Sequence, residues 1–208
     1  MSEEFYTTLE HEGVAKFEEK RSVFISQAKP VKTEAEALEF IKKIKSQYRD
    51  ATHNVYAYLL DGGMTQRYSD DGEPQGTSGM PTLDTIRKSG CCDAVVVVTR
   101  YFGGILLGTG GLVRAYSQAA KMALDAAGKS TMEKLLVFSL RVNYSDLQKI
   151  EPILENYTMI RLDTAYADDV RLSAAMREGE YPALEKALTE RTNGRAILKL
   201  EGEQFACL

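Results

Sequence analysis

A run of β-branched residues is the feature that most limits what this chain can fold into. The segment DAVVVVTRY, residues 93–101, is apolar at nearly every position instead of at alternate positions. A strand with this pattern needs apolar partners on both faces, because exposing either face would leave valines in water. The sequence therefore predicts a central buried strand, followed directly by a glycine-rich segment and a helix.

The first 130 residues place further elements around this strand. Thr33 and Glu36 form a capping box at the start of a helix, and Gly62–Gly63 predicts a hairpin turn. In chain order, the expected elements are one bent strand or two short ones over 14–29, a helix over 34–50, strands over 54–61 and 65–69, a helix over 82–89, the strand 93–101 and a helix over 112–127.

A second pattern begins near the segment KSTMEK, residues 129–134. Strand, helix, strand, strand, helix and strand follow in that order, which is the split arrangement of ferredoxin-like domains. Ser145 is the expected cap of the first of these helices. We therefore expect an α+β protein of two domains, residues 1–130 and residues 131–208.

Charge is unevenly distributed along the 208 residues. The formal net charge is −4, so the charge of the whole protein does not favour a nucleic-acid partner. However, the stretch from Ala94 to Leu124 contains no Asp or Glu, whereas it does contain Arg100, Arg114 and Lys121. The glycine-rich region is therefore locally basic.

Cysteine usage and hydropathy indicate a cytoplasmic protein with no membrane partner. The three cysteines, Cys91, Cys92 and Cys207, are too few and too irregularly spaced for a disulfide framework, which favours a reducing compartment. The amino-terminal residues contain no apolar targeting segment, and the longest apolar run, AVVVV, is too short to cross a bilayer.

The segment YFGGILLGTGGLVRAYSQAA, residues 101–120, raises the main functional question. It lacks the Gly-Lys-Ser/Thr ending of a Walker A loop, and Val113 stands where a dinucleotide-binding fingerprint needs its third glycine. Two interpretations remain: a turn that the fold requires, or an anion site in which helix N–H groups and arginines hold phosphate. The candidate anion- or nucleic-acid-binding residues are Arg100, Gly103, Gly104, Gly108, Gly110, Gly111 and Arg114.

Acidic residues cluster just before the second predicted helix. Asp70, Asp71 and Glu73 offer oxygen ligands that suit Mg²⁺, although a solvated turn explains the same pattern. Elsewhere, His53 has no paired nucleophile, and Ser78 lies in GTSGM, which lacks the closing glycine of a nucleophile elbow. We therefore assign no catalytic residue, no cofactor and no further metal site.

Two long motifs resemble a known family. RYSDDGEPQGTSGMP, residues 67–81, and VVVTRYFGGILLGTGGLVRAYSQAA, residues 96–120, closely resemble the signature of the Impact family in its bacterial YigZ-type branch. The resemblance implies a first domain with the fold of a small-subunit ribosomal protein domain and of domain IV of elongation factor G. It also implies a ferredoxin-like second domain similar to domain V of that factor.

The resemblance also frames three functional hypotheses. Eukaryotic members of the family regulate translation, which favours a non-catalytic translation-linked factor that binds RNA or the ribosome. The alternatives are a protein-interaction regulator of translation or stress response, and a Mg²⁺-dependent, nucleotide-binding enzyme similar to small-molecule kinases. Some members carry a proline-dipeptidase label, but this sequence lacks the carboxylate and histidine set of such metal sites.

Overall fold

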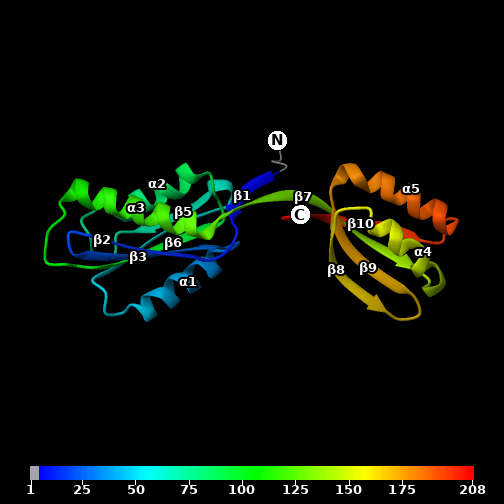
Figure 1. Cartoon of the computed structure of the whole chain (residues 1–208), viewed down its shortest axis with the longest axis horizontal. Coiled ribbons are helices and arrows are strands. Elements are labelled where there is room, and N and C mark those ends of the chain that lie inside the picture. Colours follow the sequence, from blue (N-terminus) through cyan, green and yellow to red (C-terminus); the bar gives the residue numbers. More distant parts are fainter. Residues whose placement is uncertain (1–4) are drawn as a thin grey trace. The chain divides into compact units, whose positions relative to one another are not determined.

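The computed structural model describes residues 5–208 and divides the chain into two compact units. The N-terminal unit comprises Tyr6–Thr131, and the C-terminal unit comprises Met132–Leu208 together with Phe5. Each unit combines a sheet with helices (Figure 1), so the predicted α+β class with two domains is confirmed. No helix among residues 5–208 is long and apolar enough to span a membrane.

The sheet of the N-terminal unit is built around the valine-rich strand. Its strand order is β2-β3-β6-β4-β5, and every neighbouring pair is antiparallel. The bounds are β2 Gly13–Glu19, β3 Ser22–Pro30, β4 His53–Leu60, β5 Thr65–Ser69 and β6 Ala94–Tyr101, with a one-turn 3₁₀ helix, η1, at Asp61–Gly63.

Strand β6 lies at the centre of this sheet, as its sequence predicts. Val96 and Val98 belong to the apolar core on one face, and Val95 and Val97 belong to the core on the other. All four valine side chains are fully buried. Burial on both faces is therefore the physical reason for the unbroken β-branched run.

Three helices cover the two faces of this sheet. Figure 1 shows α2 (Gly79–Ser89) and α3 (Thr109–Ala127) together on one face and α1 (Glu34–Gln47) on the opposite face. Alanines at helical spacing along α3 are buried against the sheet, which lets the helix approach closely. At one point the fit depends on glycine, because a Cβ at Gly13 would lie 2.3 Å from the backbone nitrogen of Ala127.

At the start of α1, the predicted cap by Thr33 is present, but the Glu36 side chain bonds to a different backbone nitrogen from the one in a standard capping box. The Thr33 hydroxyl accepts a hydrogen bond from the backbone nitrogen of Glu36 at 3.2 Å. The Glu36 carboxylate accepts from the backbone nitrogen of Lys32 at 2.8 Å instead of from Thr33 itself. Two N–H groups at the helix start are satisfied in this way.

The C-terminal unit has the predicted β-α-β-β-α-β order. Its sheet runs β10-β7-β9-β8, with antiparallel neighbours throughout. The bounds are β7 Lys129–Val142, α4 Tyr144–Leu154, β8 Met159–Tyr166, β9 Val170–Met176, α5 Tyr181–Thr192 and β10 Ile197–Ala206, with a 3₁₀ turn, η2, at Glu178–Glu180. A strand that the sequence analysis missed, β1 (Phe5–Leu9), pairs with β7.

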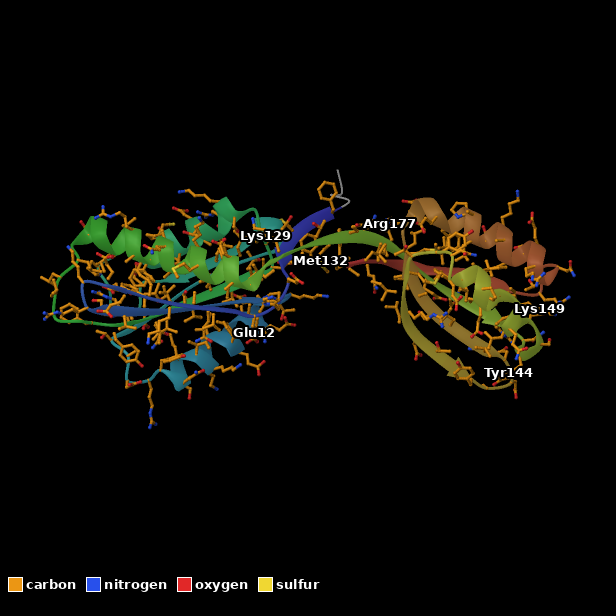
Figure 2. All side chains as sticks on the ribbon, in the orientation of Figure 1. Glu12, Lys129, Met132, Tyr144, Lys149 and Arg177 are labelled. Carbon is orange, nitrogen blue, oxygen red and sulfur yellow. The ribbon has the colours of Figure 1, made fainter. Side chains whose placement is uncertain are left out.

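A buried carboxylate organises the helix packing of the C-terminal unit. Asp146 on α4 is 1% exposed and accepts hydrogen bonds from Arg195 at 2.8 and 2.9 Å and from Lys149 at 2.7 Å. Figure 2 labels Lys149 and Tyr144 on this helix. The bonds from Arg195, followed by that from Lys149, hold the pKa of Asp146 well below its usual range. The prediction that Ser145 caps α4 is wrong, because the helix begins at Tyr144 and Asn143 occupies the cap position.

Candidate functional site

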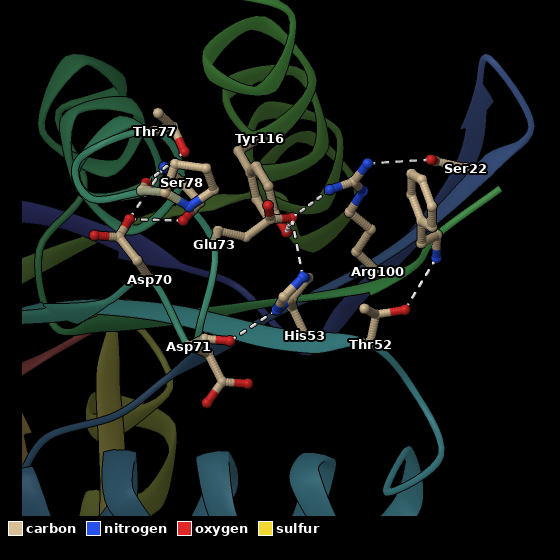
Figure 3. Close-up of polar contacts among 12 residues, drawn as sticks. Ser22, Thr52, His53, Asp70, Asp71, Glu73, Thr77, Ser78, Arg100 and Tyr116 are labelled. Atoms are coloured by element: carbon tan, nitrogen blue, oxygen red, sulfur yellow. Dashed lines mark hydrogen bonds and ion pairs between the residues drawn. The ribbon is translucent and has the colours of Figure 1, made fainter. Parts of the chain in front are cut away.

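Side chains from β4, β6 and α3 meet at one carboxylate in the N-terminal unit (Figure 3). Glu73 lies in the loop between β5 and α2, and its side chain is 3% exposed. Its Oε1 atom accepts from Arg100 Nη1 at 2.6 Å, at the end of β6, and from the Tyr116 hydroxyl at 2.8 Å, on α3. The imidazole of His53 on β4 adds a longer contact, 3.8 Å from Nε2 to the same oxygen.

Contact with Glu73 keeps the neighbouring Tyr116 protonated. Burial, followed by the charge of Glu73 and its hydrogen bond, raises the pKa of Tyr116 far above its usual range. Tyr116 therefore remains a phenol and donates its proton to the carboxylate. The ion pair of Glu73 with Arg100 is also shielded from water, so removing either partner leaves an uncompensated buried charge.

Arg100 connects this buried centre to the start of the glycine run. Its Nη2 atom donates to the Ser22 hydroxyl at 3.3 Å, and the same hydroxyl accepts from the Gly103 backbone nitrogen at 3.2 Å. The guanidinium lies near the rings of Phe24 and Phe102, 5.5 Å from each centroid. With a side chain that is 5% exposed, Arg100 acts here as an internal support of the loop.

The loop before α2 is organised by Asp70. One carboxylate oxygen accepts from the Ser78 hydroxyl at 2.6 Å, the Ser78 nitrogen at 3.1 Å and the Gly79 nitrogen at 2.8 Å. The other accepts from the Gly76 nitrogen at 2.9 Å. Burial alone would raise the pKa of Asp70, but the bond from Ser78 and those from the three N–H groups outweigh it and lower the pKa.

Asp71 points to a different set of partners. Its carboxylate accepts from Lys45 Nζ at 2.6 Å and from the Asn54 nitrogen at 2.7 Å, while its backbone carbonyl lies 2.8 Å from His53 Nδ1. The carboxylates of Asp70, Asp71 and Glu73 therefore have separate partners, although His53 contacts both the backbone of Asp71 and the side chain of Glu73. Within residues 5–208, no group of three or more His, Cys, Asp or Glu side chains is placed to hold a metal ion.

Among the glycines of residues 103–111, one allows a close backbone contact and others adopt positive φ angles. A Cβ at Gly103 would lie 2.1 Å from the backbone carbonyl of Arg21, so only glycine lets the loop pass the β2–β3 turn. Gly104 and Gly108 have φ of +81° and +72° and no neighbour within 4 Å of an added Cβ. Gly110 and Gly111 lie in the first turn of α3, which begins at Thr109 after Gly108, a cap residue without a side-chain hydrogen bond.

The surface around this helix start is exposed, apolar and basic. Phe102, Ile105 and Leu106 are 45%, 40% and 82% exposed. Arg114 in the first turns of α3 is exposed, as is Arg21, whose backbone lies against Gly103. In the part of the chain that the structure describes, neither arginine takes part in an ion pair, and Arg114 Nη1 lies 3.7 Å from the position that a Cβ on Gly110 would occupy. We call residues 102–111 with Arg21 and Arg114 the glycine-loop surface.

The structure thus brings the sequence-predicted residues together in two sets. Arg100 and Glu73 form the buried centre, whereas Arg114 and the glycines lie on the exposed surface that this centre supports. Sequence analysis missed Tyr116, Ser22 and Arg21. Tyr116 falls on the apolar stripe of α3 and is indistinguishable in the sequence from an ordinary core residue, because its partner Glu73 lies 43 positions away.

Comparison with known proteins places this arrangement in a family. The Impact N-terminal domain matches residues 20–124, and a domain of unknown function (DUF1949) matches residues 140–195. The IMPACT family member YvyE of Bacillus subtilis is 38% identical over 199 residues, covering 95% of this chain and 91% of YvyE. The IMPACT family member YigZ of Escherichia coli is 32% identical over 178 residues, covering 84% of this chain and 87% of YigZ.

A solved structure supports the same assignment. A crystal structure described as that of a hypothetical protein covers 94% of this chain and 96% of its own, with 29% sequence identity and a TM-score of 0.64. The family domain, the bacterial relatives and this fold agree over nearly the whole sequence. The chain therefore belongs to the IMPACT family and has the two-domain organisation of its bacterial members.

Proposed function

We propose that this protein is a non-catalytic, translation-linked factor that binds RNA through the glycine-loop surface. The observation that carries the proposal is the exposed, uncapped start of α3, with Arg114 in its first turns and the backbone of Arg21 against Gly103 in the preceding loop; neither arginine forms an ion pair within the described residues. It lies in the acid-free stretch 94–124 of an otherwise acidic chain. RNA binding to this surface would use local charge, so the net charge of −4 does not oppose it.

The phosphate chemistry follows from the helix start. The first N–H groups of a helix have no partner within the helix, and its dipole favours an anion at that end. Among the described residues, the Leu112 nitrogen bonds to the Gly108 carbonyl at 2.9 Å, while the nitrogens of Thr109, Gly110 and Gly111 have no partner. Without a Cβ, Gly110 leaves room for a phosphate to approach, and Arg114 supplies the charge.

The apolar part of the surface suits an unpaired base. Single-stranded RNA is commonly held by aromatic side chains that stack on its bases. Phe102 is half exposed, and its ring is held on one side by the buried Arg100 guanidinium. The loop thus combines a pre-positioned aromatic ring with an adjacent phosphate site.

A protein partner is the second candidate for the same surface. Leu106 is 82% exposed and Ile105 is 40% exposed, and adjacent exposed aliphatic side chains are typical of protein contacts. A protein contact through these residues would survive nuclease treatment and moderate salt, whereas RNA binding would not. Salt dependence therefore separates the two candidates.

RNA binding can be tested directly by fluorescence anisotropy. The full-length protein is titrated into a labelled single-stranded RNA at several salt concentrations between about 50 and 200 mM, a range over which phosphate contacts weaken strongly. For Arg21→Ala/Arg114→Ala we expect the dissociation constant to rise about tenfold. The slope of log K against log salt should fall by about 0.7 for each phosphate that the variant no longer neutralises.

A matched control uses a cation elsewhere on the chain. Arg161 is exposed on β8 of the C-terminal unit, and its replacement by Ala removes the same kind of charge. This variant should keep the wild-type affinity and salt slope. Equal affinities for the wild type, the double variant and the control would contradict the proposed surface.

A further inference from the structure

A groove runs between α2 and α3 on the face of the N-terminal unit that lies away from the sheet. Its volume is about 790 Å³, within the range of small-molecule binding sites. The two helices run in the same direction: Glu73, six residues before α2, bonds to Tyr116 in the first half of α3, and Lys129, just after α3, donates to the carbonyl of Ser89 at the end of α2. Figure 2 labels Lys129 at this end.

The groove differs chemically between its two ends. Met80 on α2 and Val113 on α3 line the end near the helix starts, and Val113 is 38% exposed. Eight residues further along each helix, Lys88 and Lys121 line the other end. Eight residues of helix span about 12 Å. The groove therefore has apolar side chains toward one end and lysines toward the other, with the polar Thr85, Ser117 and Gln118 also in its lining, over the length of a medium-sized ligand.

The cationic end carries charge that the protein does not neutralise. Among the described residues, neither Lys88 nor Lys121 forms an ion pair. Asp84, the carboxylate nearest in sequence on α2, is already paired with Arg87 at 2.7 Å. Asp125 is the one lining carboxylate without an ion pair in the described chain, and Lys129 adds a third cation. These groups leave a net positive charge at this end of the groove.

We propose that this groove binds a small amphiphilic carboxylate, with the carboxylate between Lys88 and Lys121 and the apolar tail toward Met80 and Val113. We choose this class of ligand because the lining of the groove changes from apolar to cationic along its length. An amphipathic helix does not match this groove, because it is polar along one face instead of at one end. A nucleic acid does not match it either, because it needs a continuous cationic track. The site is separate from the proposed RNA-binding function and uses none of its residues.

Dodecanoate is a suitable probe, kept below its micelle-forming concentration and titrated into the ¹⁵N-labelled full-length protein. We expect saturable NMR shift changes confined to α2 and α3. In Lys88→Ala/Lys121→Ala the dissociation constant should rise about tenfold or more, because the ligand carboxylate loses two charged hydrogen-bond donors. Val113→Glu, which places a carboxylate at the apolar end, should also weaken binding, while circular dichroism verifies its fold.

Two controls make the result decisive. Lys42→Ala removes an exposed lysine on α1, on the opposite face of the sheet, and should leave dodecanoate binding unchanged. Dodecanol has the tail without the charge and should bind at least about tenfold more weakly than dodecanoate. The proposal would be overturned if NMR shift changes spread over both units, or if dodecanol bound as tightly as dodecanoate. It would also be overturned if Lys88→Ala/Lys121→Ala bound dodecanoate with the wild-type affinity. RNA affinity should be unchanged in that variant, so the two proposals can fail independently.

Discussion

At the scale of single residues, Glu73 is the centre of the buried polar contacts that join β4, β6 and α3. It accepts from Arg100 and Tyr116 and lies near His53, while its side chain is almost fully buried. A buried ion pair adds little net stability by itself, but breaking it is costly because one charge loses its partner. Variants at this position therefore report on the integrity of the whole site.

Replacing Arg100 by Met should lower the free energy of unfolding by about 3–5 kcal/mol, because Glu73 is then left charged and unpaired in the interior. Urea unfolding followed by circular dichroism measures this decrease. Glu73→Leu/Arg100→Met removes both charges and should lose clearly less stability than the sum of the two single variants. Additive decreases would show that the two side chains do not interact.

Asp70 makes a separate contribution, which depends on pH. Its carboxylate accepts from Gly76, Ser78 and Gly79, so Asp70→Asn, which puts an NH₂ group against these donors, should cost about 1–2 kcal/mol at neutral pH. The folded-state pKa is lowered. The contribution is therefore present above the ordinary pKa of aspartate, near 4, and is lost as pH falls through the folded-state value.

Thermal melts of the wild type and Asp70→Asn between neutral pH and about pH 3, a range that crosses the ordinary aspartate pKa, test this sign. The difference in melting temperature should shrink as the pH falls. A difference that stays constant or grows on acidification would contradict the assigned role of the carboxylate.

At the scale of secondary-structure elements, close approach between β2 and α3 determines how the sheet is covered. A Cβ at Gly13 would lie 2.3–2.7 Å from backbone atoms of Ala123 and Ala127, and backbone cannot move aside as a flexible side chain can. Gly13→Ala should therefore destabilise the protein by about 2 kcal/mol or more, as overpacking of a core does. Gly179→Ala, at a site with nothing within 4 Å, is the matched control.

Melting temperatures of the two glycine variants provide the comparison. We expect a clear decrease for Gly13→Ala and no decrease for Gly179→Ala. Equal melting temperatures would mean that α3 is free to shift away from the sheet, and that its alanine-rich face does not fix its position.

The elements that can be predicted from the sequence are those whose residue pattern lies within the element itself. The valines of β6 mark their own burial, and the helical pattern over 112–127 marks most of α3, so the sequence predicts both elements. For β7 the apolar pattern predicts a start near residue 135, whereas the strand starts at Lys129. Within this polar extension, Glu133 and Lys134 pair with residues of β10. Lys134 also forms an ion pair with Glu203, and Glu133 forms one with Arg177. Those partners are distant in sequence, so no local pattern reveals them.

The candidate site follows the same rule. The motifs 67–81 and 96–120 contain Glu73, Arg100 and Tyr116, which the structure brings together, whereas α3 begins at Thr109 and so includes Gly110 and Gly111, which the helix pattern over 112–127 leaves in the preceding turn. The burial of Arg100 could not be read from sequence, because it depends on Glu73 and Ser22 reaching it from other elements. A basic residue at a strand end looks the same in a sequence whether it faces solvent or a carboxylate.

At the scale of the whole molecule, the protein combines an acidic average charge with the locally basic, exposed glycine-loop surface. The net charge of −4 argues against general affinity for polyanions. Binding confined to the glycine-loop surface would be selective for RNA that offers an accessible phosphate beside an unstacked base. The central claim is therefore that this surface associates with RNA-containing particles in the cell.

Sedimentation of cell lysate through a sucrose gradient tests this claim most directly. Wild-type protein and Arg21→Ala/Arg114→Ala are compared at low and high salt, with and without ribonuclease. Wild type should move with ribosomal particles at low salt, and high salt, ribonuclease or the double substitution should return it to the top of the gradient. Wild type that stays at the top, or a double variant that sediments as wild type does, would contradict the claim.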